Sequence, residues 1–208
     1  MIKAGWICLL VAVIGDFAVA YLLAPFYRGY SHTKQVMSIL GNPKSPVQRW
    51  YNLWLVILGI CLFASFPALV DSYWTQSAGL TLVVLILIAL FAIGAGILSG
   101  LFSVNETKAE QTFASKVHGI GASLGFMALI FVPLFLSILS FFREENEIGI
   151  LSAVSFGLAL IFFVLFIMAD KEEFKNTWIE KEGLWQRLTL MWMYLPFAAI
   201  SIQGIIRN

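Results

Sequence analysis

AGLTLVVLILIALFAIGAGILSGLF, residues 78–102, is a run of 25 residues that contains no charged side chain. At a rise of about 1.5 Å per residue, a helix of this length can cross a hydrocarbon layer about 30 Å thick. The apolar residues are continuous, whereas a surface helix of a soluble protein carries them in a stripe. The stretch therefore predicts a transmembrane helix.

The rest of the chain repeats this pattern. The 208 residues are 60% hydrophobic and 12% charged, while a soluble domain has about half of its residues apolar and about a quarter charged. Apolar runs between polar segments predict six spans, at residues 4–25, 50–70, 78–102, 117–142, 148–169 and 187–206. We therefore predict an all-α polytopic transmembrane helical bundle that forms one integral membrane domain over residues 1–208.

Several functional classes are disfavoured by what the sequence contains. The formal net charge is +1 and the basic residues lie in short segments, so we expect no nucleic-acid partner. Cys8 and Cys61 fall inside predicted spans, where a thiol behaves as a small apolar side chain. The chain has two histidines, which excludes a three-histidine zinc site. Two histidines with Glu106 or Glu110 remain conceivable, but we predict no metal and no cofactor.

Basic residues predict the orientation. The first, third and fifth connections between spans hold ten of them: Arg28, Lys34, Lys44, Arg49, Lys108, Lys116, Lys171, Lys175, Lys181 and Arg187. The opposite side holds three: Lys3, Arg143 and Arg207. The positive-inside rule therefore predicts a multi-pass plasma-membrane protein whose odd connections are cytoplasmic and whose termini are both outside.

Aromatic residues gather near the predicted span ends. We interpret them as interfacial anchors, because amphipathic rings favour the headgroup region. They are Trp6, Tyr27, Trp50, Tyr51, Trp54, Tyr73, Trp74, Trp178 and Trp185.

The first connection, FYRGYSHTKQVMSILGNPKSPVQR at residues 26–49, is unlike a hydrophilic linker. It mixes aromatic, hydroxyl and apolar residues, and Val36 to Leu40 can form one short interfacial or re-entrant turn that ends at Gly41 and the following Asn-Pro pair. We expect this segment to pack against the bundle.

Asp16 is the one acidic residue in the middle of a predicted span. A charge at that depth costs several kcal/mol unless it is neutralised or paired. It is either a functional group that contacts a proton or substrate, or a protonated side chain hydrogen-bonded to a neighbouring helix.

Polar residues on the side of the odd connections form a second set of candidates. His118 opens the fourth span in KVHGIGASLG and could act as acid or base, or could simply bind a loop carbonyl. Arg187 could hold an anionic group, or could snorkel or pair with a glutamate. Ser31, His32 and Ser38 in the first connection are candidate substrate contacts.

The sequence also resembles a known family. The stretch YRGYSHTKQVMSILGNPKSPVQRWYN, the motif LFSVNET, the motif KVHGIGASLGF and the motif EGLWQRL together resemble the prokaryotic membrane-protein family called domain of unknown function 998. The likeness covers nearly the whole chain. It implies an integral membrane bundle of bacterial or archaeal type and no established activity.

Three functional hypotheses follow. The first is a membrane protein that binds or modifies a lipid or other amphiphile in a polar pocket near one membrane face, with His118 as the catalytic residue if it is an enzyme. The second is a non-catalytic regulator or accessory subunit, as a homo-oligomer or with a membrane partner. The third is a small transporter that uses Asp16.

Overall fold

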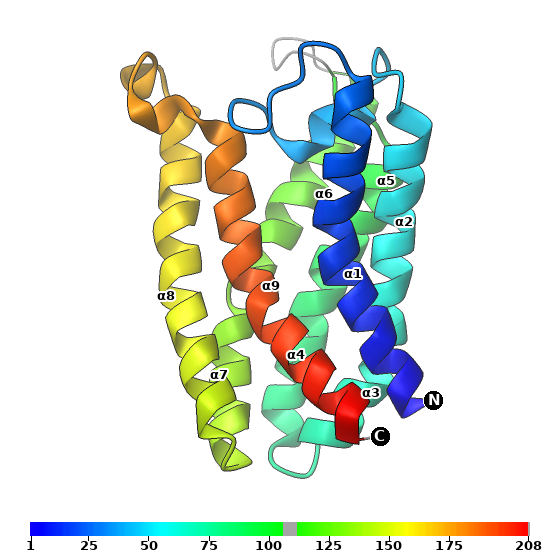
Figure 1. The fold of residues 1–208 in the computed structure, drawn as a ribbon, viewed down its shortest axis with the longest axis vertical. Helices are drawn as coiled ribbons and strands as arrows, with labels where there is room; N and C mark the ends of the chain where they lie inside the picture. Colours follow the sequence, from blue (N-terminus) through cyan, green and yellow to red (C-terminus); the bar gives the residue numbers. More distant parts are fainter. Residues whose placement is uncertain (106–111, 208) are drawn as a thin grey trace.

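The computed structural model describes residues 1–105 and 112–207, and this part of the chain is helical with no strand (Figure 1). The longer helices are α1 (Ile2–Leu23), α2 (Gln48–Ala64), α3 (Phe66–Tyr73), α4 (Ala78–Phe91), α6 (Phe113–Leu129), α7 (Val132–Phe142), α8 (Asn146–Ala169) and α9 (Glu182–Arg207). The short elements are the 3-10 turns η1 (Ala24–Phe26), η2 (Met37–Gly41), η4 (Glu172–Phe174) and η5 (Trp178–Glu180), the π-helix η3 (Ala92–Leu98) and the single turn α5 (Ser99–Leu101).

These elements form six helices that are long and apolar enough to cross a membrane, which confirms the predicted number of spans. They cover Ile2–Phe26, Gln48–Tyr73, Ala78–Leu101, Phe113–Phe142, Asn146–Ala169 and Glu182–Arg207. The last begins five residues earlier than predicted. Its polar first turn is helical because it packs under the first connection.

Three of the spans contain a local break. Pro67 and Pro133 lie in the first turns of α3 and α7, where the missing N–H of proline is tolerated. At the first break, the Ser65 hydroxyl donates to the Leu62 carbonyl oxygen at 2.6 Å. The third span widens into η3, where Ser99 donates to the Gly94 carbonyl oxygen at 2.9 Å.

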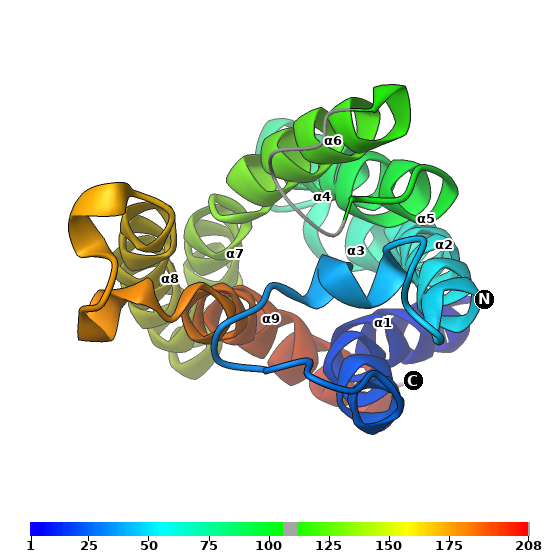
Figure 2. The same ribbon diagram turned by 90° about the horizontal axis from the view of Figure 1, so that it is seen from above.

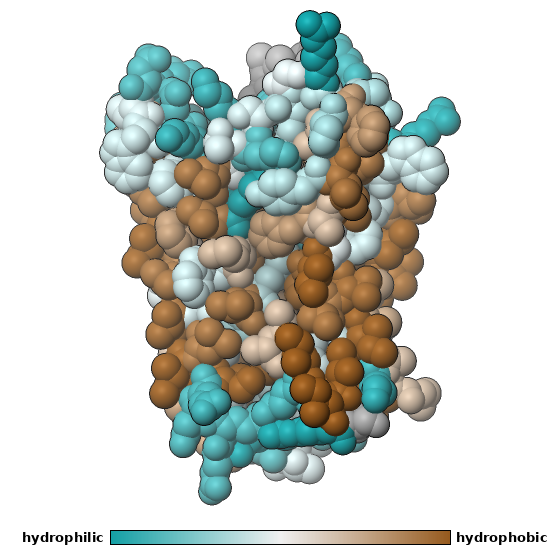
Figure 3. Space-filling view, viewed as in Figure 1, coloured by the Kyte–Doolittle hydropathy of each residue, from teal (hydrophilic) through white to brown (hydrophobic). Residues whose placement is uncertain are grey.

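The bundle has two polar ends and an apolar middle (Figure 3). The first and fifth connections lie at one end, which we call the connection face. Residues 1 and 207 lie at the opposite end with the α3–α4 and α7–α8 turns, and we call it the terminal face. The even number of spans explains why the chain starts and finishes at the same end.

Glycines allow the third span to approach two neighbours closely. A Cβ at Gly94 would overlap the Gly121 carbonyl of α6, and one at Gly125 would lie 2.9 Å from the Phe91 Cα. On the other side, a Cβ at Gly59 of α2 would lie 2.7 Å from the Ala92 carbonyl oxygen. Such small-residue seams are a common way for membrane helices to pack. Gly119 differs, because a Cβ there would meet open space.

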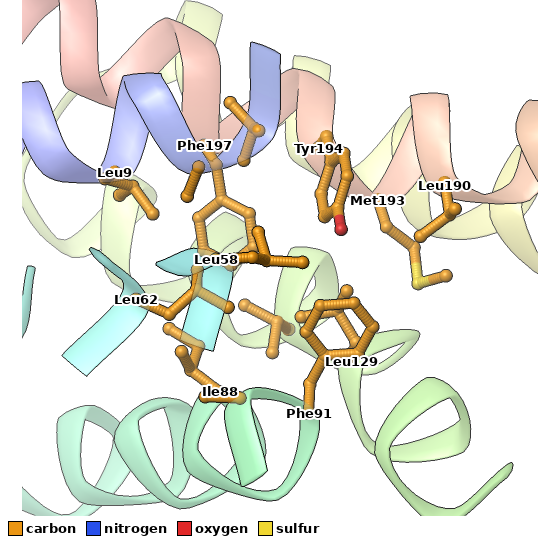
Figure 4. Close-up of a cluster of buried hydrophobic side chains, with 14 of the residues drawn as sticks. Leu9, Leu58, Leu62, Ile88, Phe91, Leu129, Leu190, Met193, Tyr194 and Phe197 are labelled. Atoms are coloured by element: carbon orange, nitrogen blue, oxygen red, sulfur yellow. The ribbon is translucent and has the colours of Figure 1, made fainter. Parts of the chain in front are cut away.

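A layer of apolar side chains fills the centre (Figure 4). Leu58 and Leu62 of α2 meet Ile88 of α4, Leu129 of α6 and Phe197 of α9 there, and each is at most 1% exposed. Around this layer, α1 packs on α2 and α9, α8 packs on α7 and α9, and the α4–η3 span packs on α2 and α6.

The interpretation of the aromatic residues as anchors is wrong for four of them. The rings of Trp50, Trp74 and Trp178 are exposed at span ends, as anchors should be. Four other rings pack inside the bundle, because adjacent helices cover them, and those of Tyr27 and Trp54 are half-buried. The four buried rings are Trp6, Tyr51, Tyr73 and Trp185.

Enlarging Gly125 should separate α6 from the third span. We expect Gly125→Leu to lower the free energy of unfolding by about 1–3 kcal/mol, the usual cost of overpacking. Gly119→Leu on the same helix is the matched control and should be tolerated. Thermal unfolding of the two variants in detergent measures the difference. Equal melting temperatures would contradict the described seam.

Candidate functional site

The first connection lies across the connection face and covers the space between the helices (Figure 2). Its apolar turn η2 points into the bundle, since Met37 is 2% exposed and Leu40 is fully buried. The Met37 backbone N–H donates to Gln186 Oε1 of α9 at 2.7 Å. The structure thus contains a short turn that ends at Gly41, and this turn packs on the bundle as predicted.

Arg187 fixes this segment to α9. One guanidinium nitrogen donates to the carbonyl oxygens of His32 at 2.6 Å, Gln35 at 3.1 Å and Gly183 at 2.8 Å. The other nitrogen donates to the Tyr30 hydroxyl at 2.7 Å and lies 3.2 Å from His32 Nδ1. The side chain is buried, and no ion pair to it occurs in residues 1–105 and 112–207. We call this set of bonds the Arg187 clamp.

Gly183 makes the clamp possible. A Cβ at this position would overlap the carbonyl oxygens of Gln35 and His32. The backbone of the first connection can therefore lie directly against the first turn of α9, within reach of Arg187 one turn further on. Leu184 also donates from its backbone N–H to the Thr33 carbonyl oxygen at 3.0 Å.

Two titratable groups outside the spans contact the clamp. His32 stacks on Tyr21 with ring centroids 4.4 Å apart. Partial burial, and secondly the nearby positive charge of Arg187, lower the pKa of His32 below its ordinary value. Burial raises the pKa of Tyr30, although the same guanidinium opposes that shift. Both groups are therefore neutral at pH 7 and leave the guanidinium as the charge of the clamp.

Asp16 lies inside the bundle, where three helices meet. Trp54 Nε1 of α2 donates to one carboxyl oxygen at 3.3 Å, and the Tyr194 hydroxyl of α9 donates to the other at 2.9 Å. The residue is 4% exposed, and it is ten residues, about 15 Å, from the end of its span at Phe26. Both carboxyl oxygens thus accept hydrogen bonds that join α1 to α2 and α9.

A cavity of about 70 Å³ lies beneath the first connection and reaches Asp16. Its walls come from one residue per turn of several helices: His118, Ala122 and Phe126 of α6 face it, as do Gln186 and Leu190 of α9. The remaining lining residues are Asp16, Met37, Ser38, Tyr51, Leu55, Leu58, Phe91, Ala95 and Ser99. From His118 to Phe126 the lining extends about 12 Å along the helix.

The hydrogen bonding of His118 defines its tautomer. Its Nδ1 lies 2.9 Å from the Phe102 carbonyl oxygen, which can only accept, so Nδ1 carries the proton. In the neutral imidazole Nε2 is then an acceptor, which is the state required of a general base. The loop carbonyl expected in the structural alternative is present, and the ring also lines the cavity.

The structure brings together only part of the predicted set. Asp16, Ser38 and His118 line the cavity beneath the first connection, whereas His32 and Arg187 belong to the clamp. Ser31 is apart from both: its hydroxyl contacts Thr33 and its N–H bonds to Gln35. We expected Arg187 to hold an anionic group, but in this structure its guanidinium donates to backbone carbonyl oxygens of the protein.

The carboxylates considered for a metal site, Glu106 and Glu110, lie outside the described residues. Within the part that is described, no three metal-ligating side chains come together.

Sequence reasoning missed the neighbours that shape the site. Tyr51 and Trp54 have the composition of interfacial anchors, but they point inward from α2. Gly183 and Gln186 precede Arg187 in the motif EGLWQRL, where we selected only the arginine as a candidate site residue. Tyr194 lies in a long apolar span of the sequence, and no pattern there indicates that its hydroxyl contacts Asp16 of another helix.

Comparison with known proteins gives one match. The family described as protein of unknown function (DUF998) matches residues 10–203. The chain belongs to this family. No curated protein and no solved structure matches the chain. The DUF998 assignment confirms the suspected resemblance, and it spans the first connection, the clamp and the cavity alike.

Loss of the clamp should release the first connection. In Arg187→Gln, we expect trypsin to cleave after the exposed Lys34 at least about tenfold faster, because hydrogen bonds to a charged group contribute about 1.5–3 kcal/mol each. Arg187→Lys should be intermediate, since an ammonium cannot reproduce the forked geometry. Arg49→Gln, an exposed arginine on the same face, is the control. Unchanged cleavage in Arg187→Gln would refute the clamp.

The clamp should also respond to pH. Because the pKa of His32 is lower in the folded protein than in the unfolded chain, its contribution to stability is present above about pH 6.5 and is lost as pH falls through the folded pKa. NMR titration of the imidazole should give a midpoint below 6.5 that rises in Arg187→Gln. A midpoint at or above 6.5 in the wild type would contradict this environment.

Proposed function

We propose that this integral membrane protein binds a lipid or another amphiphile in the cavity beneath the first connection. The observation that carries the proposal is the lining itself: polar groups near the connection face, and apolar side chains deeper in the bundle. Small-molecule sites are commonly apolar cavities of about 300–1,000 Å³ with a few polar groups that orient the ligand. The free volume beneath the first connection is smaller, about 70 Å³, so its walls must move apart to admit an alkyl chain.

The order of groups along the cavity suits a molecule with one polar end. Ser38, Gln186 and His118 provide hydroxyl, amide and imidazole groups next to the headgroup region. Leu58, Leu190 and Phe126 extend the walls toward the membrane centre, where an alkyl chain has the lowest free energy. The clamp holds Met37 and Ser38 over this space and so defines its polar end.

The same lining supports chemistry only at one position. With Nδ1 bound to Phe102, the imidazole of His118 can accept a proton at Nε2 from a bound hydroxyl or amine. No nucleophile is described in hydrogen-bond contact with this ring. Binding is therefore the primary proposal, and modification of the bound amphiphile by His118 is an extension of it.

Transport is a second candidate because of Asp16. Its carboxyl group is at the cavity wall, about halfway through its span, and no cationic side chain forms an ion pair with it in the residues described. Intramembrane carboxylates of this kind are common in proton and solute pathways. Transport predicts that Asp16→Asn abolishes flux while binding persists, whereas a binding protein has no flux to lose.

Filling the cavity should expel the ligand. In Ala122→Phe we expect the amphiphile that co-purifies with the protein to fall by about tenfold, since overpacking costs about 1–3 kcal/mol. Ser123→Phe places the same ring on the exposed side of α6 and is the matched control. Mass spectrometry of extracts from both purified variants gives the comparison. Equal ligand content in the two would count against the cavity as the binding site.

Binding and modification differ in their effect on cells. If His118 acts on the amphiphile, cells that carry the protein should show a changed lipid class, and His118→Ala should restore the composition of cells that lack it. If the protein only binds, all three lipidomes should coincide while the wild type still co-purifies with its ligand. Host-cell lipidomes at matched expression decide between these outcomes.

A further inference from the structure

A second cavity lies at the terminal face and has a different character. Its volume is about 140 Å³. It is lined by Trp6 of α1, the α3 residues Asp71, Ser72 and Tyr73, Arg143 and Glu145 of the α7–α8 turn, and Ile200, Gln203, Gly204 and Arg207 of α9. All of these elements end at this face (Figure 1), so the cavity lies at the level of lipid headgroups. It shares no lining residue with the cavity beneath the first connection.

Charged groups of both signs organise this cavity. Glu145 Oε1 accepts hydrogen bonds from Arg207 and, at 3.2 Å, from Arg143. Arg143 also donates to the Ser72 carbonyl oxygen, and its guanidinium lies 5.4 Å from the centre of the Tyr73 ring. With Asp71 at the rim, the lining carries two positive and two negative groups.

Three buried polar atoms of the lining have no hydrogen-bond partner within residues 1–105 and 112–207. Two are donors, the Trp6 indole Nε1 and the Arg143 Nε, and one is an acceptor, Glu145 Oε2. Trp6 is only 2% exposed, and buried polar groups in a folded protein are normally paired. The cavity thus offers two unused N–H groups for an anion and one unused carboxylate oxygen for a donor.

We propose that this cavity binds the phosphoethanolamine headgroup of a membrane phospholipid. Its phosphate oxygens accept from Trp6 Nε1 and Arg143 Nε, and its primary ammonium donates to Glu145 Oε2. A zwitterionic group fits a lining whose formal charges balance, whereas an anionic lipid adds a negative charge and has no ammonium to donate to Glu145 Oε2. The acyl chains then remain in the bilayer beside the bundle.

The ammonium is the part of the ligand that discriminates. A phosphatidylcholine headgroup carries the same phosphate and charge, but its quaternary ammonium has no N–H to donate. Phosphatidylglycerol has hydroxyl donors but no positive charge. The site therefore favours phosphatidylethanolamine over both, by the one hydrogen bond that only a primary ammonium makes to a carboxylate.

Native mass spectrometry of the purified protein with each of the three lipids tests the proposal. We expect phosphatidylethanolamine to bind about tenfold more tightly than phosphatidylcholine, as for one hydrogen bond between charged groups. Glu145→Gln should reduce this ratio to near one. Trp6→Phe should weaken binding of both lipids and leave their ratio unchanged, because it removes only a phosphate contact.

Controls make the test independent of folding and of the other cavity. Trp74→Phe alters an exposed tryptophan on the same face and should bind as the wild type does. Ala122→Phe, which fills the first cavity, should also leave the lipid ratio intact. Equal affinity for the three lipids, or a preference that survives both Glu145→Gln and Trp6→Phe, would overturn the proposal. If soluble glycerophosphoethanolamine stabilises the protein and phosphatidylethanolamine does not, a membrane phospholipid is rejected as the source of the bound headgroup.

Discussion

The buried guanidinium of Arg187 is the interaction on which the functional end of this protein depends. A non-helical segment at the membrane surface has backbone carbonyls that cannot bond within a helix, and burying them without donors is costly. Arg187 provides those donors to His32 and Gln35, 155 and 152 residues away in sequence. One side chain thereby satisfies the backbone of the first connection and fixes it over the bundle.

The cavity follows from this arrangement together with the glycine seams. Close approach at Gly94 and Gly59 draws the third span against α6 and α2. Asp16 joins α1 to α2 and α9 by two hydrogen bonds from aromatic side chains. The remaining space lies beneath η2, and Leu58, Phe91 and Phe126 are among its apolar walls.

The sequence predicts the fold well because lipid imposes one simple requirement. Continuous apolar runs such as 78–102 must form helices that satisfy their own backbone, so the number of spans follows from composition. Asp16 and His118 could be selected because ionisable groups are rare there. The short turn at Ser38 to Gly41 was predictable from its apolar residues and the Asn-Pro pair that follows.

The contacts of the site could not be predicted in the same way. The partners of Arg187 are carbonyl oxygens, which every residue possesses, so no residue type marks them. Tyr51 and Trp6 have the sequence context of interfacial anchors, and only the packing of neighbouring helices turns them inward. Glu145 follows Arg143 in a turn, but its bond to Arg207 depends on where α9 ends.

A crystal structure of the protein grown from a lipidic mesophase tests the central claim most directly. The account predicts the first connection held by Arg187, and elongated electron density beneath it with its polar end beside His118 and Gln186. A first connection displaced from α9, with side chains filling the space between Ser38 and Phe126, would contradict the account.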